Sequence, residues 1–184
     1  MICHERKFIF IHVNKTGGTS ITKLLGGVGA DKKHRYACSY ERYLPKEFNT
    51  YFKFSIVRNP WEKLLSQYFF RIKDDTQHGY SRKDKDLSFL DFLQKPFPAG
   101  HALQFDKLSD SKGNLCMDFV GRFENLQEDF NTICDKIGVP QQELPHVNKT
   151  KHKHYTEYYD DETRELIAEL YAKDIEHFGY EFGR

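Results

Sequence analysis

The sequence predicts an α/β fold in which a central parallel sheet is covered by helices on both faces. Short apolar segments rich in β-branched and aromatic residues, at 6–13, 52–57 and 118–123, predict buried strands. A segment with helical spacing follows each of them, and this alternation is typical of a parallel sheet between two helical layers. The chain has 184 residues and no internal repeat or evident linker, so a single domain over residues 1–184 is expected.

Caps and breakers set the limits of the helices in the first part of the chain. The helix after the first strand begins at Gly17–Gly18 and stops at Gly26–Gly27. A short helix is expected near Glu41–Phe48. Pro60 suits the first turn of the next helix, and Asn59 is its expected cap.

Later segments follow the same logic. Residues 71–86 lose apolar periodicity and alternate in charge, which indicates an exposed excursion. Short and long amphipathic helices are expected at 88–94 and 124–138. A polar loop is expected at 149–159, followed by one final helix within 160–182.

Composition excludes several classes of protein. Lys and Arg number 28 against 27 Asp and Glu, so a net charge of +1 does not favour nucleic acid as a partner. No apolar run reaches the roughly 20 residues of a membrane span, and the charged first residues do not resemble a signal peptide. The cysteines are scattered, which favours reduced thiols and a soluble, cytoplasmic protein: Cys3, Cys38, Cys116 and Cys134. The KHKH stretch at 151–154 has no nearby acidic ligand, so no metal site is predicted.

The stretch HVNKTGGTS, which follows the first strand, has the features of an anion-binding loop. A glycine-rich turn that opens a helix presents backbone N–H groups and the positive end of a helix dipole to one point. The candidate ligand-binding residues combine one charge, two glycines and three hydroxyls: Lys15, Thr16, Gly17, Gly18, Thr19 and Ser20. The lysine precedes the glycines, unlike that of a GxxxxGK[ST] loop, and no clear magnesium-binding strand follows. A metal-free use of the anion site is therefore favoured.

A second motif, YFKFSIVRNPWEKLLSQYFF, places Arg58 at the end of the second strand and Ser66 in the helix behind it. An arginine fork with an added hydroxyl donor suits a second fixed anion. For Arg58 alone, a structural ion pair is the competing interpretation.

Together, HVNKTGGTS and IVRNPWEKLLSQY resemble the two nucleotide signatures of sulfotransferases that use 3′-phosphoadenosine 5′-phosphosulfate (PAPS). The most similar branch contains carbohydrate sulfotransferases, such as heparan 2-O- and chondroitin 4-O-enzymes, and their bacterial relatives. DFVGRFENLQEDF and the C-terminal segment extend the likeness, which covers about 6–70 and 100–182 but not 71–99. The resemblance implies a P-loop-like three-layer fold. Because the sequence has no apolar segment that could serve as a membrane anchor, we expect a soluble member of bacterial or viral type.

The same resemblance implies which residues bind the donor. Residues 15–20 fall on the loop for the 5′-phosphosulfate, and Arg58 and Ser66 fall on the positions for the 3′-phosphate. Asn14 stands where many relatives have proline. Weaker candidates for contact with the donor are Arg122, Asn148, Thr150 and Lys151.

Sulfuryl transfer needs a base for the acceptor hydroxyl and positive charge at the leaving phosphate oxygen. Lys15 is the candidate for the charge. His34 is the candidate base, because imidazole titrates near neutral pH and similar glycan 2-O-sulfotransferases place a catalytic histidine in that connection. Four alternative bases stay open: His12, His101, Glu41 and Asp31. For His12, its place in the strand favours a structural role.

The predicted function is therefore transfer of a sulfuryl group from PAPS to an acceptor hydroxyl, on a glycan or a small alcohol. Specificity is expected to lie in 31–48 and 71–99, since loops on a rigid scaffold carry recognition. Two alternatives remain: a P-loop kinase or phosphotransferase that uses ATP and magnesium, and a nucleotide-binding module without catalysis.

Overall fold

The computed structural model describes residues 1–26, 35–72, 86–94, 102–145 and 153–184. The chain divides into two compact units that alternate along the sequence. The first unit consists of Met1–Arg58 and Ala102–Asn148, and the second of Asn59–His101 and Lys149–Arg184. The single domain expected over 1–184 stays a prediction.

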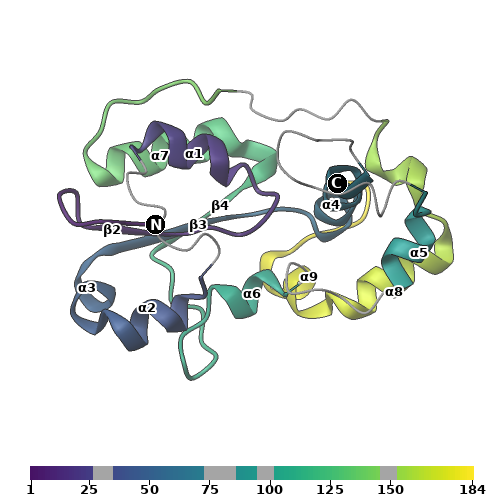
Figure 1. The fold of residues 1–184 in the computed structure, drawn as a ribbon, viewed down its shortest axis with the longest axis horizontal. Coiled ribbons are helices and arrows are strands. Elements are labelled where there is room, and N and C mark those ends of the chain that lie inside the picture. The colour runs from purple at the N-terminus through teal and green to yellow at the C-terminus, as the bar shows by residue number, and fades with distance from the viewer. Residues whose placement is uncertain (27–34, 73–85, 95–101, 146–152) are drawn as a thin grey trace. The chain divides into compact units, whose positions relative to one another are not determined.

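The first unit contains a four-stranded sheet of order β1-β2-β3-β4 (Figure 1). Its strands are β1 (Ile2–Cys3), β2 (Phe8–Ile11), β3 (Phe52–Val57) and β4 (Phe119–Arg122). The pairs β2–β3 and β3–β4 are parallel, which confirms the three predicted strands and their direction. At one edge of this sheet the two-residue β1, which the sequence did not predict, pairs antiparallel with β2. Antiparallel neighbours need only a tight connection, which the few residues between these strands supply.

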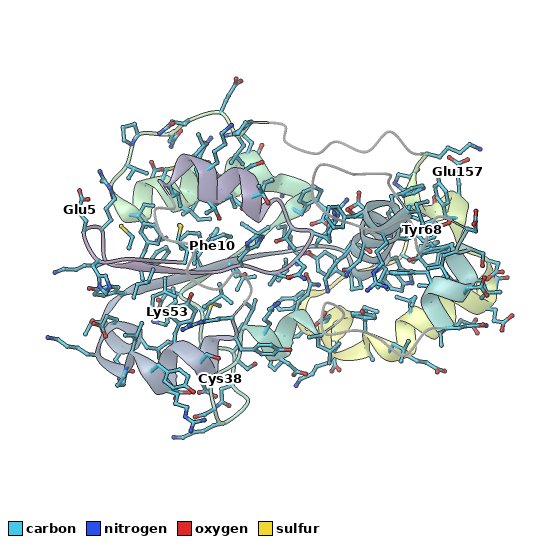
Figure 2. All side chains as sticks on the ribbon, viewed as in Figure 1. Glu5, Phe10, Cys38, Lys53, Tyr68 and Glu157 are labelled. Carbon is cyan, nitrogen blue, oxygen red and sulfur yellow. The ribbon has the colours of Figure 1, made fainter. Side chains whose placement is uncertain are left out.

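Helices cover both faces of this sheet (Figure 1). The helices α1 (Gly18–Leu24) and α7 (Leu126–Ile137) lie on one face, and α2 (Ala37–Tyr43) and α3 (Pro45–Thr50) on the other. Alternation along the strands divides the side chains: Figure 2 shows Phe10 on the side of α1 and α7 and Lys53 on the side of α2 and α3. The three-layer α/β fold is thereby confirmed.

An apolar core joins the sheet to α1 and α7. Burial of each large apolar side chain contributes about 1.5–3 kcal/mol, so this cluster fixes which strand faces point inward. Its buried members are Phe8, Phe10, Ile21, Phe54, Ile56, Phe130, Ile133, Cys134 and Ile137.

Strand register brings the ends of the parallel strands to one edge of the sheet. Ile11 pairs with Ser55, and the Ser55 hydroxyl donates to the Ile11 carbonyl at 2.6 Å. Val57 pairs with Arg122 at the end of β4. The segments that follow β2, β3 and β4 therefore begin close together.

Two features of the first unit differ from expectation. The single helix expected near Glu41–Phe48 is instead the pair α2 and α3, because Pro45 starts a new helix at its N1 position. The sequence also did not predict the four-residue helix α6 (Gln104–Lys107).

The second unit is helical. Its elements are α4 (Pro60–Ile72), α5 (Phe89–Gln94), the 3₁₀ turn η5 (Tyr155–Tyr158), α8 (Asp161–Leu170) and α9 (Ala172–Phe178). The single final helix expected within 160–182 is wrong, since the chain leaves helical geometry at Tyr171. Buried Ile167, Tyr171 and Phe178 keep helical spacing across the break, which conceals it in the sequence. Within the described parts of the chain, no helix has the length and apolar character needed to cross a membrane.

Asn59 caps α4 as predicted. Its Oδ1 accepts from the Trp61 N–H at 3.1 Å, while its Nδ2 donates to the Glu181 carbonyl at 3.0 Å. The Trp61 indole donates to the Arg164 carbonyl at 3.0 Å. The start of α4 is thus held by contacts with the C-terminal part of the second unit.

Candidate active site

The loop between β2 and α1 has an unusual backbone. Lys15 and Gly17 both adopt left-handed conformations, with φ of 67° and 76°. For a residue with a Cβ this region is uncommon, and such outliers gather at ligand-binding sites. Gly17 is the N-cap of α1, whose first N–H groups have no partners within the helix. The loop therefore directs donors and the positive end of the helix dipole to one place.

Gly18 allows a close contact beneath the loop. A Cβ at this position would overlap the imidazole of His12, which lies directly against it. The His12 ring also stacks on Phe10, with 5.6 Å between ring centroids. His12 therefore packs between the strand and the loop, and a catalytic role for it stays a prediction.

Two hydroxyls of the motif brace the loop itself. The fully buried Thr16 donates from Oγ1 to the Val13 carbonyl at 2.9 Å. Ser20 donates from Oγ to the Pro145 carbonyl at 2.8 Å. Thr19 is exposed and Lys15 is half-buried. In this conformation the backbone N–H groups and Lys15 are the groups best suited to meet an anion.

Arg58 connects the two motifs. It follows β3 and is only 7% exposed, and its Nη1 donates to the Lys15 carbonyl at 2.9 Å. The guanidinium carbon lies 3.9 Å from the centroid of the Phe123 ring, a cation–π contact. The hydrogen bond joins the second motif to the left-handed residue of the first, and the sequence did not predict it.

Gln104 holds the backbone of Arg58. Its Oε1 accepts from the Arg58 N–H at 3.0 Å, and its Nε2 donates to the Arg58 carbonyl at 2.8 Å. The side chain is fully buried. Sequence reasoning missed this residue, although it lies three positions after the candidate His101.

Lys107, at the other end of α6, lies beside the residue that precedes Lys15. Its Nζ donates to Asn14 Oδ1 at 3.4 Å and lies 5.6 Å from the centroid of the Tyr36 ring. Burial lowers the pKa of Lys107 to about 8. Tyr36 follows His34 by two residues in the sequence, so the described end of that connection lies close to the loop.

The remaining candidates divide into those with described positions and those without. Arg122 ends β4, and its N–H donates to Asp129 Oδ2 at 2.5 Å. Glu41 accepts from the Ser111 N–H at 2.7 Å, so its carboxylate braces a loop. Ser66 is buried in α4 of the second unit, and its pairing with Arg58 stays a prediction. Six candidates lie outside the described residues: Asp31, His34, His101, Asn148, Thr150 and Lys151.

Over the described ranges, no three His, Cys, Asp or Glu side chains are grouped so that they could hold a metal ion. The chemistry available there comes from Lys15, Arg58, Lys107 and the backbone donors of the loop. This is a set for binding and neutralising anions.

Comparison with known proteins gives the family. The model of the Sulfotransferase family matches residues 1–181, and the chain belongs to that family. The predicted resemblance to sulfotransferases is thereby confirmed.

Three relatives give the range of similarity. An uncharacterized protein of Archaeoglobus fulgidus is 33% identical over 114 residues, which cover 60% of this chain and 87% of that protein. Human carbohydrate sulfotransferase 9 and zebrafish (Danio rerio) carbohydrate sulfotransferase 14 are each 26% identical, over 93% and 98% of this chain. The matches span 47% and 61% of the lengths of these two enzymes.

Proposed function

We propose that this sulfotransferase takes a sulfuryl group from PAPS and transfers it to a hydroxyl group of a carbohydrate. The observation that carries the proposal is the hydrogen bond from Arg58 to the Lys15 carbonyl at 2.9 Å. It unites the two motifs that resemble the signatures for the two ends of the donor. Family membership supplies the class of reaction.

The residues present fit such a donor. The left-handed turn at Lys15 and Gly17 and the start of α1 suit the 5′-phosphosulfate, whose oxygens would meet backbone N–H groups and the Lys15 ammonium. Arg58 and Ser66 would bind the 3′-phosphate. A guanidinium carries five N–H donors, so Arg58 can hold the Lys15 carbonyl and a phosphate together. Further contacts are assigned to Arg122, Thr150 and Lys151.

The transfer step uses two side chains of this protein. The donor supplies a sulfuryl group bonded to a phosphate oxygen that leaves with the electron pair of the broken S–O bond. His34 takes the proton of the acceptor hydroxyl as its oxygen bonds to sulfur. Lys15 neutralises the charge that develops on the leaving oxygen. Because the transferred group carries a single negative charge, these residues are proposed to act without a metal ion.

The proposed acceptor class follows the relatives, two of which are named carbohydrate sulfotransferases. A small alcohol is the competing acceptor. Incubation with PAPS and either desulfated glycan chains or short-chain alcohols separates the two, with transfer of ³⁵S-labelled sulfate as the measurement. Labelling of alcohols but not glycans would overturn the carbohydrate assignment.

Thermal unfolding with added ligand tests the donor. 3′-Phosphoadenosine 5′-phosphate (PAP), the product nucleotide, should stabilise the chain by about 2.7 kcal/mol at 100 times its dissociation constant. ATP with magnesium is the comparison ligand. Stabilisation by ATP with magnesium and not by PAP would replace the proposal with a P-loop phosphotransferase.

Substitution of His34 tests whether the chain is an enzyme with that base. His34→Ala should lower kcat by about 10²–10⁴ and leave PAP binding intact, since general base catalysis contributes about that factor. His152→Ala serves as the matched histidine control. Wild-type protein that binds PAP but transfers no sulfate to any acceptor would point to a non-catalytic module.

A further inference from the structure

Arg58 lies where the backbone is buried but no longer paired with a neighbouring strand. It comes directly after Val57, the last residue of β3, where ladder pairing ends, and it is 7% exposed. Its N–H and carbonyl are polar groups that need partners when they are buried. Both bond to a single side chain, that of Gln104, at 3.0 and 2.8 Å.

This amide acts like one more residue of a neighbouring strand. A glutamine side chain offers one acceptor and two donors in the same plane, which matches the N–H and C=O of one backbone residue. Gln104 is fully buried and comes from α6, a segment 46 residues further along the chain. Its position fixes the Cα of Arg58 and thus the origin of the guanidinium.

We propose that Gln104 is a positioning residue of the donor site, which holds the Arg58 backbone so that the guanidinium reaches the Lys15 carbonyl and the 3′-phosphate. This inference rests on the proposed function, in which Arg58 binds the donor. The chain of contacts is continuous: Gln104 bonds to Arg58, and Arg58 bonds to Lys15 at 2.9 Å. The Phe123 ring, whose centroid lies 3.9 Å from the guanidinium carbon, also restricts movement of the Arg58 side chain.

A double-mutant cycle tests the proposal through PAP affinity. Gln104→Met preserves length and volume but removes both hydrogen bonds to Arg58. It should weaken PAP binding roughly tenfold in the wild-type background and by less than about twofold in an Arg58→Ala background, because residues that act through one another are not additive. A merely structural Gln104 would lower the thermal midpoint and leave the affinity of the folded protein unchanged in both backgrounds.

Ser109→Ala is the matched control. Ser109 is also buried in this segment, and its hydroxyl donates to the Phe105 carbonyl at 2.7 Å. It should lower stability without changing PAP affinity. Gln104→Glu, which keeps the acceptor for the Arg58 N–H, should bind PAP with intermediate affinity and replaces Gln104→Met in the cycle if that variant does not fold.

Amide hydrogen exchange of Arg58 separates this inference from the proposed function. Gln104→Met should speed exchange at the Arg58 N–H at least tenfold relative to its β3 neighbours, and Ser109→Ala should not. If wild-type protein binds no PAP, the proposed function fails, while unchanged exchange at Arg58 would overturn the positioning role on its own. Equal loss of PAP affinity in both arms of the cycle would also overturn it.

Discussion

The segments after β2 and after β3 reach the same edge of the sheet by different means. After β2, the shape comes from the backbone: Lys15 and Gly17 adopt left-handed angles, and Gly18 lies against His12. All of these residues lie within seven positions of one another. After β3, the shape comes from side chains far along the sequence, because Gln104 holds the Arg58 backbone.

The difference separates local from non-local specification of a site. A glycine-rich loop can be recognised in the sequence because its conformation depends on which residues lack a Cβ. For an arginine at a strand end, the sequence shows only the charge. The orientation of the arginine side chain depends on partners that the fold supplies. Substitutions should therefore affect the first segment through chemistry and close packing, and the second through lost hydrogen bonds.

The largest effect is expected from Lys15→Ala. Removal of the charge that we propose neutralises the leaving oxygen should lower kcat/KM by about 10²–10³, as loss of one stabilising donor does elsewhere. The free energy of unfolding should hardly change, since the Lys15 side chain is half-buried and not part of the core. Steady-state kinetics with labelled PAPS measures the first quantity and urea unfolding the second.

Lys23→Ala, on the exposed side of α1, is the control for Lys15→Ala and should retain full activity. Full activity of Lys15→Ala itself would remove this residue from the mechanism.

Gly18→Ala comes next and tests close packing in the same loop. The new methyl group would overlap the His12 ring, so the free energy of unfolding should fall by up to about 3 kcal/mol, the usual cost of overpacking. The double variant with His12→Ala removes the obstacle and should recover part of that loss. Equal destabilisation of the single and double variants would show that the ring is not the cause.

The predictability of the fold follows the same division. Strand 52–57 and the capped start of α4 were predicted because apolar runs and the Asn59–Pro60 pair are local signals. The break at Tyr171 was missed, since apolar spacing continues through it. In the site, the glycine turn that opens α1 was predicted from its own residues, and the ligand of the loop stays a prediction. The roles of Gln104 and Lys107 were not, because hydrogen bonds across 46 and 93 positions leave no periodic trace.

Asn59→Ala, a substitution in the segment after β3, should have a smaller effect. It removes the acceptor for the Trp61 N–H and the donor to the Glu181 carbonyl, and should lower the free energy of unfolding by about 2 kcal/mol. Asn59→Ser retains a capping oxygen and should lose about half as much. Urea unfolding of the three proteins measures this series, and identical stability of Ala and Ser variants would argue against the cap.

The smallest effect is expected from Lys107 and depends on pH. Burial lowers the pKa of Lys107 from 10.5 to about 8, so the unfolded chain holds more protons between these two values. The charged amine therefore destabilises the fold below pH 8, and this penalty fades as pH rises toward 10.5. Lys107→Met should be more stable than wild type at pH 7, by a margin that shrinks by roughly 1 kcal/mol at pH 9.

The exposed Lys112→Met variant is the control for Lys107→Met, because it replaces a lysine that is not buried. Urea unfolding at pH 7, 8 and 9 gives both series. A constant margin for Lys107→Met would mean that the amine keeps an ordinary pKa beside Asn14 and Tyr36. In that case Lys107, in α6, would contact Asn14 and Tyr36 as an ordinary charged amine. The contrast between the segments after β2 and after β3 would then depend on the hydrogen bonds between Gln104 and the Arg58 backbone.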